Sequence, residues 1–195
     1  MTDFDSVLVG AMSRLLDHSK SYSLRSEDEV RGFLVANLMR DIPSLWKLIQ
    51  EMPTEAKYKR SGNSLIETSP GRSGRIDIVI RATGGKSAGI EIEYPRGKGL
   101  KDRDTFISHL RNDLLKLGNE RSFLRRYLIV FLYGDPPVDR REIEASLAPE
   151  TEKTKVAILR MAKASQRRES HPLIWSTEMP ARWLLAKTRQ LKDRG

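Results

Sequence analysis

Three carboxylates in two neighbouring strand-like segments are the residues best suited to do chemistry. Asp77 lies in residues 75–81, which read RIDIVIR, and Glu91 and Glu93 lie in residues 88–94, which read AGIEIEY. Side chains alternate between the two faces of a strand. We therefore expect Asp77 to face away from Ile76, Ile78 and Ile80, and the two glutamates to face away from Ile90, Ile92 and Tyr94.

A hairpin is predicted to bring these acids together. Gly84, Gly85 and Lys86 separate the two segments, which is typical of a tight connection between antiparallel strands. Because both apolar sets must face the same core, the register of the hairpin is constrained. A loop with an odd number of residues then places Asp77 opposite Glu91 or Glu93.

Opposed residues of an antiparallel pair have Cβ atoms roughly 4.5–5.5 Å apart, and like charges placed there are destabilising. A divalent cation relieves that repulsion, and Mg²⁺ (or Mn²⁺) takes oxygen ligands of this kind. Such a cation acidifies a bound water and neutralises charge on a phosphate. The alternative is a solvated polar face on which Arg75 and Arg81 pair with Glu93 and Glu91.

The order GRIDIVI, short turn, GIEIEY, helix and apolar strand resembles the PD-(D/E)XK nuclease superfamily. The resemblance implies that Asp77 and Glu91 are metal ligands, with the carbonyl of Ile92 as a further oxygen ligand. It also implies an acid near the start of the first core helix, where Glu27 is the first choice and Glu29 the second. Both glutamates could instead simply favour the helix N-terminus electrostatically.

This chain departs from the superfamily at Glu93, where most members carry lysine. Glu93 could position or deprotonate the attacking water, or it could mark a member that has lost activity. Lys98, Lys101 or Lys116 could supply the missing cation, and the sequence does not choose among them. For Lys116 and its neighbour Asp113, a solvated helix face is the expectation.

Basic residues are numerous, and the formal net charge of +9 favours a polyanionic partner. Two groups are predicted to contact nucleic acid. The first lies in the glycine-containing loop after the second strand, and the second lies on a predicted helix that also carries Lys155 and Arg160, where a solvated face is the alternative. The predicted contacts are Arg96, Lys98, Lys101, Lys163, Arg167 and Arg168.

Hydrophobic periodicity predicts an α/β chain. Helices are expected at residues 3–18, from Ser26 to about Pro43, and at 104–117, 139–147, 151–168 and 180–191. Strands are expected at 55–60, 64–68, 75–81, 88–94, 125–134 and 172–176. Pro43 either ends its helix or begins a short second piece through Leu45, Trp46 and Ile49, and Gly118 fits the position after a helix end.

The resemblance covers roughly residues 27–133 and implies a restriction-endonuclease-like core, with a central mixed sheet flanked by helices. One domain is expected over residues 1–195, with its core at 26–134, an N-terminal helix at 3–18 and a helical C-terminal extension at 135–195. The chain has no cysteine, which excludes disulfides and thiolate metal sites. No apolar run approaches the roughly 20 residues of a membrane span, and no signal peptide is evident, so we expect a cytoplasmic protein.

The expected function is a metal-dependent nuclease that hydrolyses DNA phosphodiester bonds and that, by analogy, could act as a homodimer. The alternative is a catalytically inactive nuclease-like module that binds nucleic acid or a protein partner. A third alternative is a basic adaptor protein unrelated to nucleic acid.

Overall fold

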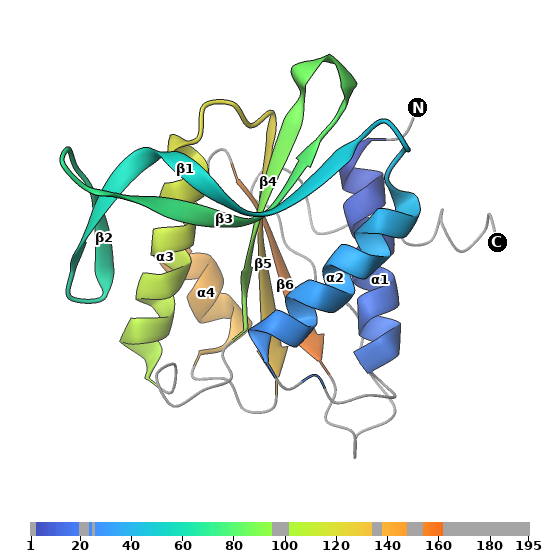
Figure 1. The fold of residues 1–195 in the computed structure, drawn as a ribbon. Helices are drawn as coiled ribbons and strands as arrows, with labels where there is room; N and C mark the ends of the chain where they lie inside the picture. Colours follow the sequence, from blue (N-terminus) through green and yellow to red (C-terminus); the bar gives the residue numbers. More distant parts are fainter. Residues whose placement is uncertain are drawn as a thin grey trace.

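A mixed six-stranded sheet with helices on both faces organises the chain (Figure 1). The computed structural model describes residues 3–19, 24, 26–94, 102–133, 138–147 and 154–161. The helices are α1 (Phe4–Ser19), α2 (Glu27–Asp41), α3 (Arg103–Asn119) and α4 (Arg140–Leu147). The strands are β1 (Lys47–Ser61), β2 (Ser64–Glu67), β3 (Arg72–Arg81), β4 (Ser87–Glu93), β5 (Arg125–Tyr133) and β6 (Lys155–Met161).

The strand order is β2-β1-β3-β4-β5-β6. The pairs β1–β2, β1–β3 and β3–β4 are antiparallel, whereas β4–β5 and β5–β6 are parallel. Each parallel pair is joined across a helix, α3 or α4, as a parallel connection requires. The prediction of an α/β chain with a mixed sheet flanked by helices is confirmed.

Two hydrophobic cores lie on the two faces of the sheet. The first packs α1 and α2 against residues such as Ile78, Ile90 and Ile129, and the second packs α3 and α4 against residues such as Val79 and Leu128. Strand β5 contributes alternate residues to both cores, so its continuous apolar run is explained by burial on both faces. Burying each such aliphatic side chain stabilises the fold by roughly 1.5–3 kcal/mol.

Two predicted local signals shape the elements next to the site. Ser26 caps α2, because its Oγ accepts a hydrogen bond from the backbone N–H of Glu29 at 3.2 Å. The β3–β4 hairpin turns through a short 3₁₀ segment, Thr83–Gly85. Gly84 and Gly85 adopt φ values of 78° and 77°, which glycine reaches without steric cost. The loop between the paired residues Arg81 and Ser87 has the odd length that the sequence required.

Three sequence predictions about the elements are wrong. Helix α2 ends at Asp41, so the alternative in which Pro43 ends its helix is confirmed. The other alternative, a short helix after Pro43, is wrong: Trp46 donates to the Pro43 carbonyl in a turn, and β1 begins at Lys47 because its backbone pairs with β3. Gly118 lies inside α3, which ends one residue later at Asn119.

The third error concerns the helical C-terminal extension at 135–195. Within it, α4 is helical, but β6 is a strand that pairs in parallel with β5. Its buried residues alternate between the two cores, and a strand buried on both faces has no polar residues to reveal its period. The strand predicted at 172–176 and the helix predicted at 180–191 lie outside the described residues.

No helix in the described ranges is both long enough and apolar enough to cross a membrane.

Candidate active site

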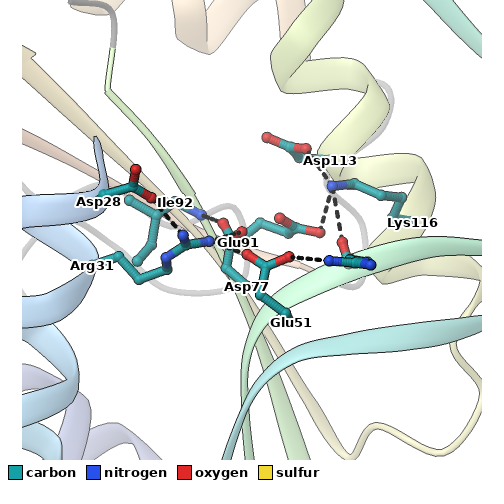
Figure 2. Close-up of polar contacts among 9 residues, drawn as sticks. Asp28, Arg31, Glu51, Asp77, Glu91, Ile92, Asp113 and Lys116 are labelled. Carbon is teal, nitrogen blue, oxygen red and sulfur yellow. Dashed lines mark hydrogen bonds and ion pairs between the residues drawn. The ribbon is translucent and has the colours of Figure 1, made fainter. Parts of the chain in front are cut away.

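Asp77 lies where β3 and β4 separate. The last paired residues of the hairpin are Ile78 and Ile90, and continuing that register places Asp77 level with Glu91. Beyond this point a side-chain hydrogen bond takes the place of backbone pairing between the two strands. The Oδ2 of Asp77 accepts a hydrogen bond from the N–H of Ile92 at 2.8 Å (Figure 2). The Asp77 carboxylate is therefore fixed at the mouth of the split, with 14% of its side chain exposed.

The alternation of side chains between the two faces of β3 is interrupted at Asp77. We expected Ile76 to share a face with Ile78 and Ile80, and this is wrong. Ile76 packs with Val79 in the core beneath α3, whereas Ile78 and Ile80 pack beneath α1 and α2. Residues three apart share a face only if the strand rotates locally. The rotation occurs at Asp77 and frees its side chain from both cores.

Strand β1 shows the same interruption at the neighbouring position. Ile49 and Met52, also three residues apart, both pack against the core beneath α3. Between them Glu51 adopts φ 53°, and it is the one non-glycine residue with positive φ that the described backbone shows. Glu51 is level with Asp77, since Gln50 pairs with Ile78 and Met52 with Ile76. A non-glycine residue in this conformation costs of order 1–3 kcal/mol.

Glu91 and Glu93 do face away from the isoleucines of β4, but they are buried beneath α3. Glu91 is 1% exposed and Glu93 is 5% exposed. Asp113 of α3 is also buried, at 8% exposed, and faces the same space. The expectation that Asp113 and Lys116 form a solvated helix face is wrong, because α3 packs this side of the helix onto the sheet.

Lys116 places its ammonium group among these acids. Its Nζ lies 2.7 Å from Glu91 Oε1 and 2.9 Å from Asp113 Oδ1, and it donates a hydrogen bond to the Arg75 carbonyl at 3.2 Å (Figure 2). The contacts with Glu91 and Asp113 are ion pairs. Burial alone would lower the pKa of Lys116, but Asp113 and Glu91 outweigh burial and raise it, so the ammonium stays charged.

The buried carboxyl groups of Glu91, Glu93 and Asp113 outnumber the single ammonium group of Lys116. Burial raises the pKa of Glu91 well above its usual value, and Asp113 raises it further. Burial, then Asp113 and Glu27, raise the pKa of Glu93 to about 9. Its Oε1 is buried and finds no hydrogen-bond partner in the part of the chain that the structure describes. His109 approaches the other oxygen, with Nδ1 4.0 Å from Oε2. Without added positive charge, Glu93 therefore holds a proton at neutral pH.

Glu27 belongs to the same electrostatic cluster. It is half-buried in the first turn of α2, and burial, then Asp77 and Asp113, raise its pKa to about 7. Glu29, the second choice from the sequence, is exposed. The structure therefore separates the two candidates, and Glu27 is the acid that adds to the site.

Arg31, one turn further along α2, supplies the second cation. Its Nη1 lies 3.4 Å from Asp77 Oδ1 and also pairs with Glu51, while Nη2 pairs with Asp28 (Figure 2). The predicted alternative, with Arg75 and Arg81 on the glutamates of β4, is wrong. Arg75 instead lies 3.5 Å from Glu51 Oε2, and Arg81 donates to the sulfur of Met52.

The donor chemistry at this point suits a hard divalent cation, because Asp77, Glu91 and Glu93 offer carboxylate oxygens and no sulfur. Among the residues that the structure describes, no group of three or more His, Cys, Asp or Glu side chains is spaced to hold a metal ion. A site built from two carboxylates, one backbone carbonyl and waters needs only Asp77 and Glu91 as side-chain ligands, and Mg²⁺ characteristically keeps several waters.

The predicted nucleic-acid contacts Arg96, Lys98, Lys101, Lys163, Arg167 and Arg168 lie outside the described residues. Lys155, assigned to the basic helix in the sequence, is instead on β6. Its ammonium is buried and lies 3.0 Å from both oxygens of Asp5. Lys155 is thus a structural ion-pair residue at the opposite end of the sheet strands.

Sequence reasoning missed Arg31 and Glu51 as site residues, placed Asp113 on a solvated helix face, and left Lys116 as one of three possible cations. A signal for Asp113 was present, because residues 106, 110, 113 and 117 form one helical stripe in which Phe106, Leu110 and Leu117 are apolar. An acid in the middle of such a stripe is either paired or functional. For Glu51 there was no signal, since its backbone conformation depends on its neighbours in the sheet.

The sequence matches no protein-family model and no curated protein.

Proposed function

We propose that this chain is a metal-dependent nuclease that hydrolyses DNA phosphodiester bonds at the split between β3 and β4. The observation that carries the proposal is the position of Lys116, whose ammonium lies 2.7 Å from Glu91. An aspartate, a glutamate and a lysine thus meet in space, although the strand itself carries Glu93 where a lysine is usual in the superfamily that the sequence resembles.

The order of elements supports a restriction-endonuclease-like core. A helix (α2), three antiparallel strands (β1, β3, β4), a helix (α3) and a parallel strand (β5) follow one another, with β2 as an addition to β1. The acids lie at the end of β4 where the chain leaves the sheet towards α3. This edge, at the carboxyl ends of the parallel strands β4 and β5, is where ligands bind in open α/β sheets.

Each residue then has a defined role. Asp77 and Glu91 would hold the divalent cation, together with the Ile92 carbonyl. The bound metal would supply an acidified water and would offset charge on the phosphate. Lys116 stabilises negative charge that develops on the phosphate oxygens, since buried carboxylates keep its ammonium protonated. Glu93 and Glu27 are the acids available to position the attacking water.

The test is cleavage of supercoiled plasmid with Mg²⁺ or Mn²⁺. Asp77→Asn, Glu91→Gln and Lys116→Met are compared with the wild-type chain and with two controls, Glu55→Gln and Lys86→Met. Both control residues are exposed, Glu55 on β1 and Lys86 in the β3–β4 turn. We expect each site variant to lower the rate at least about a hundredfold, the scale of losing one charge-stabilising group. Undiminished cleavage by Lys116→Met would contradict the proposal.

A second candidate is supported by a specific observation. Arg31 contacts Asp77 and Lys116 contacts Glu91, so both proposed ligands already have a cationic partner. That arrangement also suits a nuclease-like module that binds nucleic acid or a protein partner without cleaving it. Retention of DNA in a binding assay, with no cleavage by the wild-type chain in either metal, would favour this second candidate.

A further inference from the structure

Strands β1, β2 and β3 extend beyond the rest of the sheet as a twisted arm that passes α3 (Figure 1). One face of this arm is turned towards α3. Tyr58 is buried there and receives a hydrogen bond from Asn119 of α3 at 3.4 Å. A side chain built on Gly74 would meet Lys116 and Tyr58, which places Gly74 on the same face.

The opposite face of the arm carries exposed cations. Lys57 and Lys59 alternate with Tyr58, so they point away from α3. Lys57 pairs with Ser73, and Arg75 follows two residues later on β3 and shares that face. All three basic side chains are exposed, Arg75 to 70%. We call the surface formed by Lys57, Lys59 and Arg75 the arm face.

The cross-strand partners of the two lysines are not acids. The paired residues on their side of the arm are uncharged: Lys57 lies opposite Ser73 and Lys59 opposite Ile66. Lys57 donates a hydrogen bond to Ser73 Oγ at 2.7 Å. Within the described ranges, neither lysine forms a salt bridge. The acid of the arm's edge strand, Glu67, lies on the other face, where Asn119 donates to it.

The arm face runs directly into the candidate active site. Arg75 Nη1 lies 3.5 Å from Glu51 Oε2, and the Arg75 carbonyl accepts a hydrogen bond from Lys116. Successive residues on one face of a strand are roughly 6.8 Å apart, so Lys57 and Lys59 continue a row of positive charge away from the split. Arg75 has Glu51 as its acidic partner, whereas the two lysines form no salt bridge within the described ranges. An exposed row of this kind suits a phosphate backbone better than a protein surface of mixed charge.

We propose that the arm face binds the phosphate backbone of the nucleic acid that enters the split at Asp77. This inference rests on the proposed function for the choice of ligand. The arm face would position the phosphate backbone and would not read the base sequence. Its ammonium and guanidinium groups suit contacts with phosphate, and contacts with phosphate carry no sequence information directly.

The experiment measures binding of a fluorescent DNA duplex by anisotropy in EDTA, over a series of salt concentrations. EDTA prevents cleavage, so the result does not depend on catalysis. The test variant is K57Q/K59Q/R75Q, and the matched control is R60Q/R72Q/K86Q. The control removes the same charge from exposed positions: Arg60 and Arg72 lie on the other side of the arm, and Lys86 lies in the distant hairpin turn.

We expect the arm-face variant to bind at least about tenfold more weakly, with a salt slope shallower by roughly 2–3, since each lost phosphate contact removes about 0.9. The control should change the affinity much less and leave the slope unaltered. Equal losses in both variants, or no binding by the wild-type chain even at low salt, would overturn the inference. Binding through the arm face without cleavage in Mg²⁺ would leave it standing while removing the nuclease proposal.

Discussion

Replacing Glu93 by glutamine should make the chain more stable, and increasingly so as the pH rises. Burial, with Asp113 and Glu27, raises the pKa of Glu93 from 4.5 to about 9. Between these values the folded chain keeps a proton that the unfolded chain releases, so the free energy of unfolding falls as pH rises. One pKa unit corresponds to about 1.36 kcal/mol, so Glu93 lowers that free energy by roughly 3 kcal/mol between pH 5 and pH 7. Glutamine cannot ionise and escapes this loss.

Urea unfolding in EDTA at pH 5, 7 and 8.5 measures the effect. The difference between Glu93→Gln and the wild type should be small at pH 5, about 3 kcal/mol larger at pH 7, and larger again at pH 8.5. The control is Glu55→Gln, which removes an exposed carboxylate from β1 and should show no such trend. A stability difference that stays constant from pH 5 to pH 8.5 would refute the claim that Glu93 is buried in its protonated form.

Three further predictions use the same unfolding assay. Lys116→Met should destabilise the metal-free chain at pH 8 by about 3–5 kcal/mol, because it removes the cation from buried carboxylates. The loss should be smaller at pH 5, where these carboxylates are protonated, and an equal loss at both pH values would contradict the prediction. Gly89→Ala should cost about 1–3 kcal/mol or more, since the new Cβ would lie 2.2 Å from the Phe123 ring, and unchanged stability would show that the ring moves aside freely. Glu51→Gly should be more stable than Glu51→Ala by about 1 kcal/mol, because only alanine retains the strain of φ 53°, and the reverse order would contradict the left-handed backbone.

The hairpin acids were predictable because they depend on short-range rules. Strand alternation, an odd loop and two glycines sufficed to place Asp77 opposite Glu91 or Glu93, and the register in the structure selects Glu91. The same rules failed one residue further on, where Ile76 turns to the α3 side. The alternation is interrupted because β1 and β3 rotate together at Glu51 and Asp77. The sequence pattern within one strand does not indicate what the neighbouring strand does.

The cation of the site was not predictable from local sequence. Lys98, Lys101 and Lys116 were equal candidates, and the choice of Lys116 depends on how α3 is rotated on the sheet. Packing of Phe106, Leu110 and Leu117 fixes that rotation. The same limit explains β6, which reads as an apolar helix until the parallel partner β5 is known.

The distance in sequence between Glu91 and Lys116 has a consequence for folding. Glu91 comes from a hairpin whose strands are neighbours in the chain, but its counter-ion Lys116 arrives only when α3 docks, whereas the partner of Asp77 is Arg31 of α2. A folding intermediate with the hairpin formed and α3 detached would carry bare, mutually repelling carboxylates open to water. Docking of α3 thus buries an apolar stripe and brings Lys116 to Glu91 in a single event.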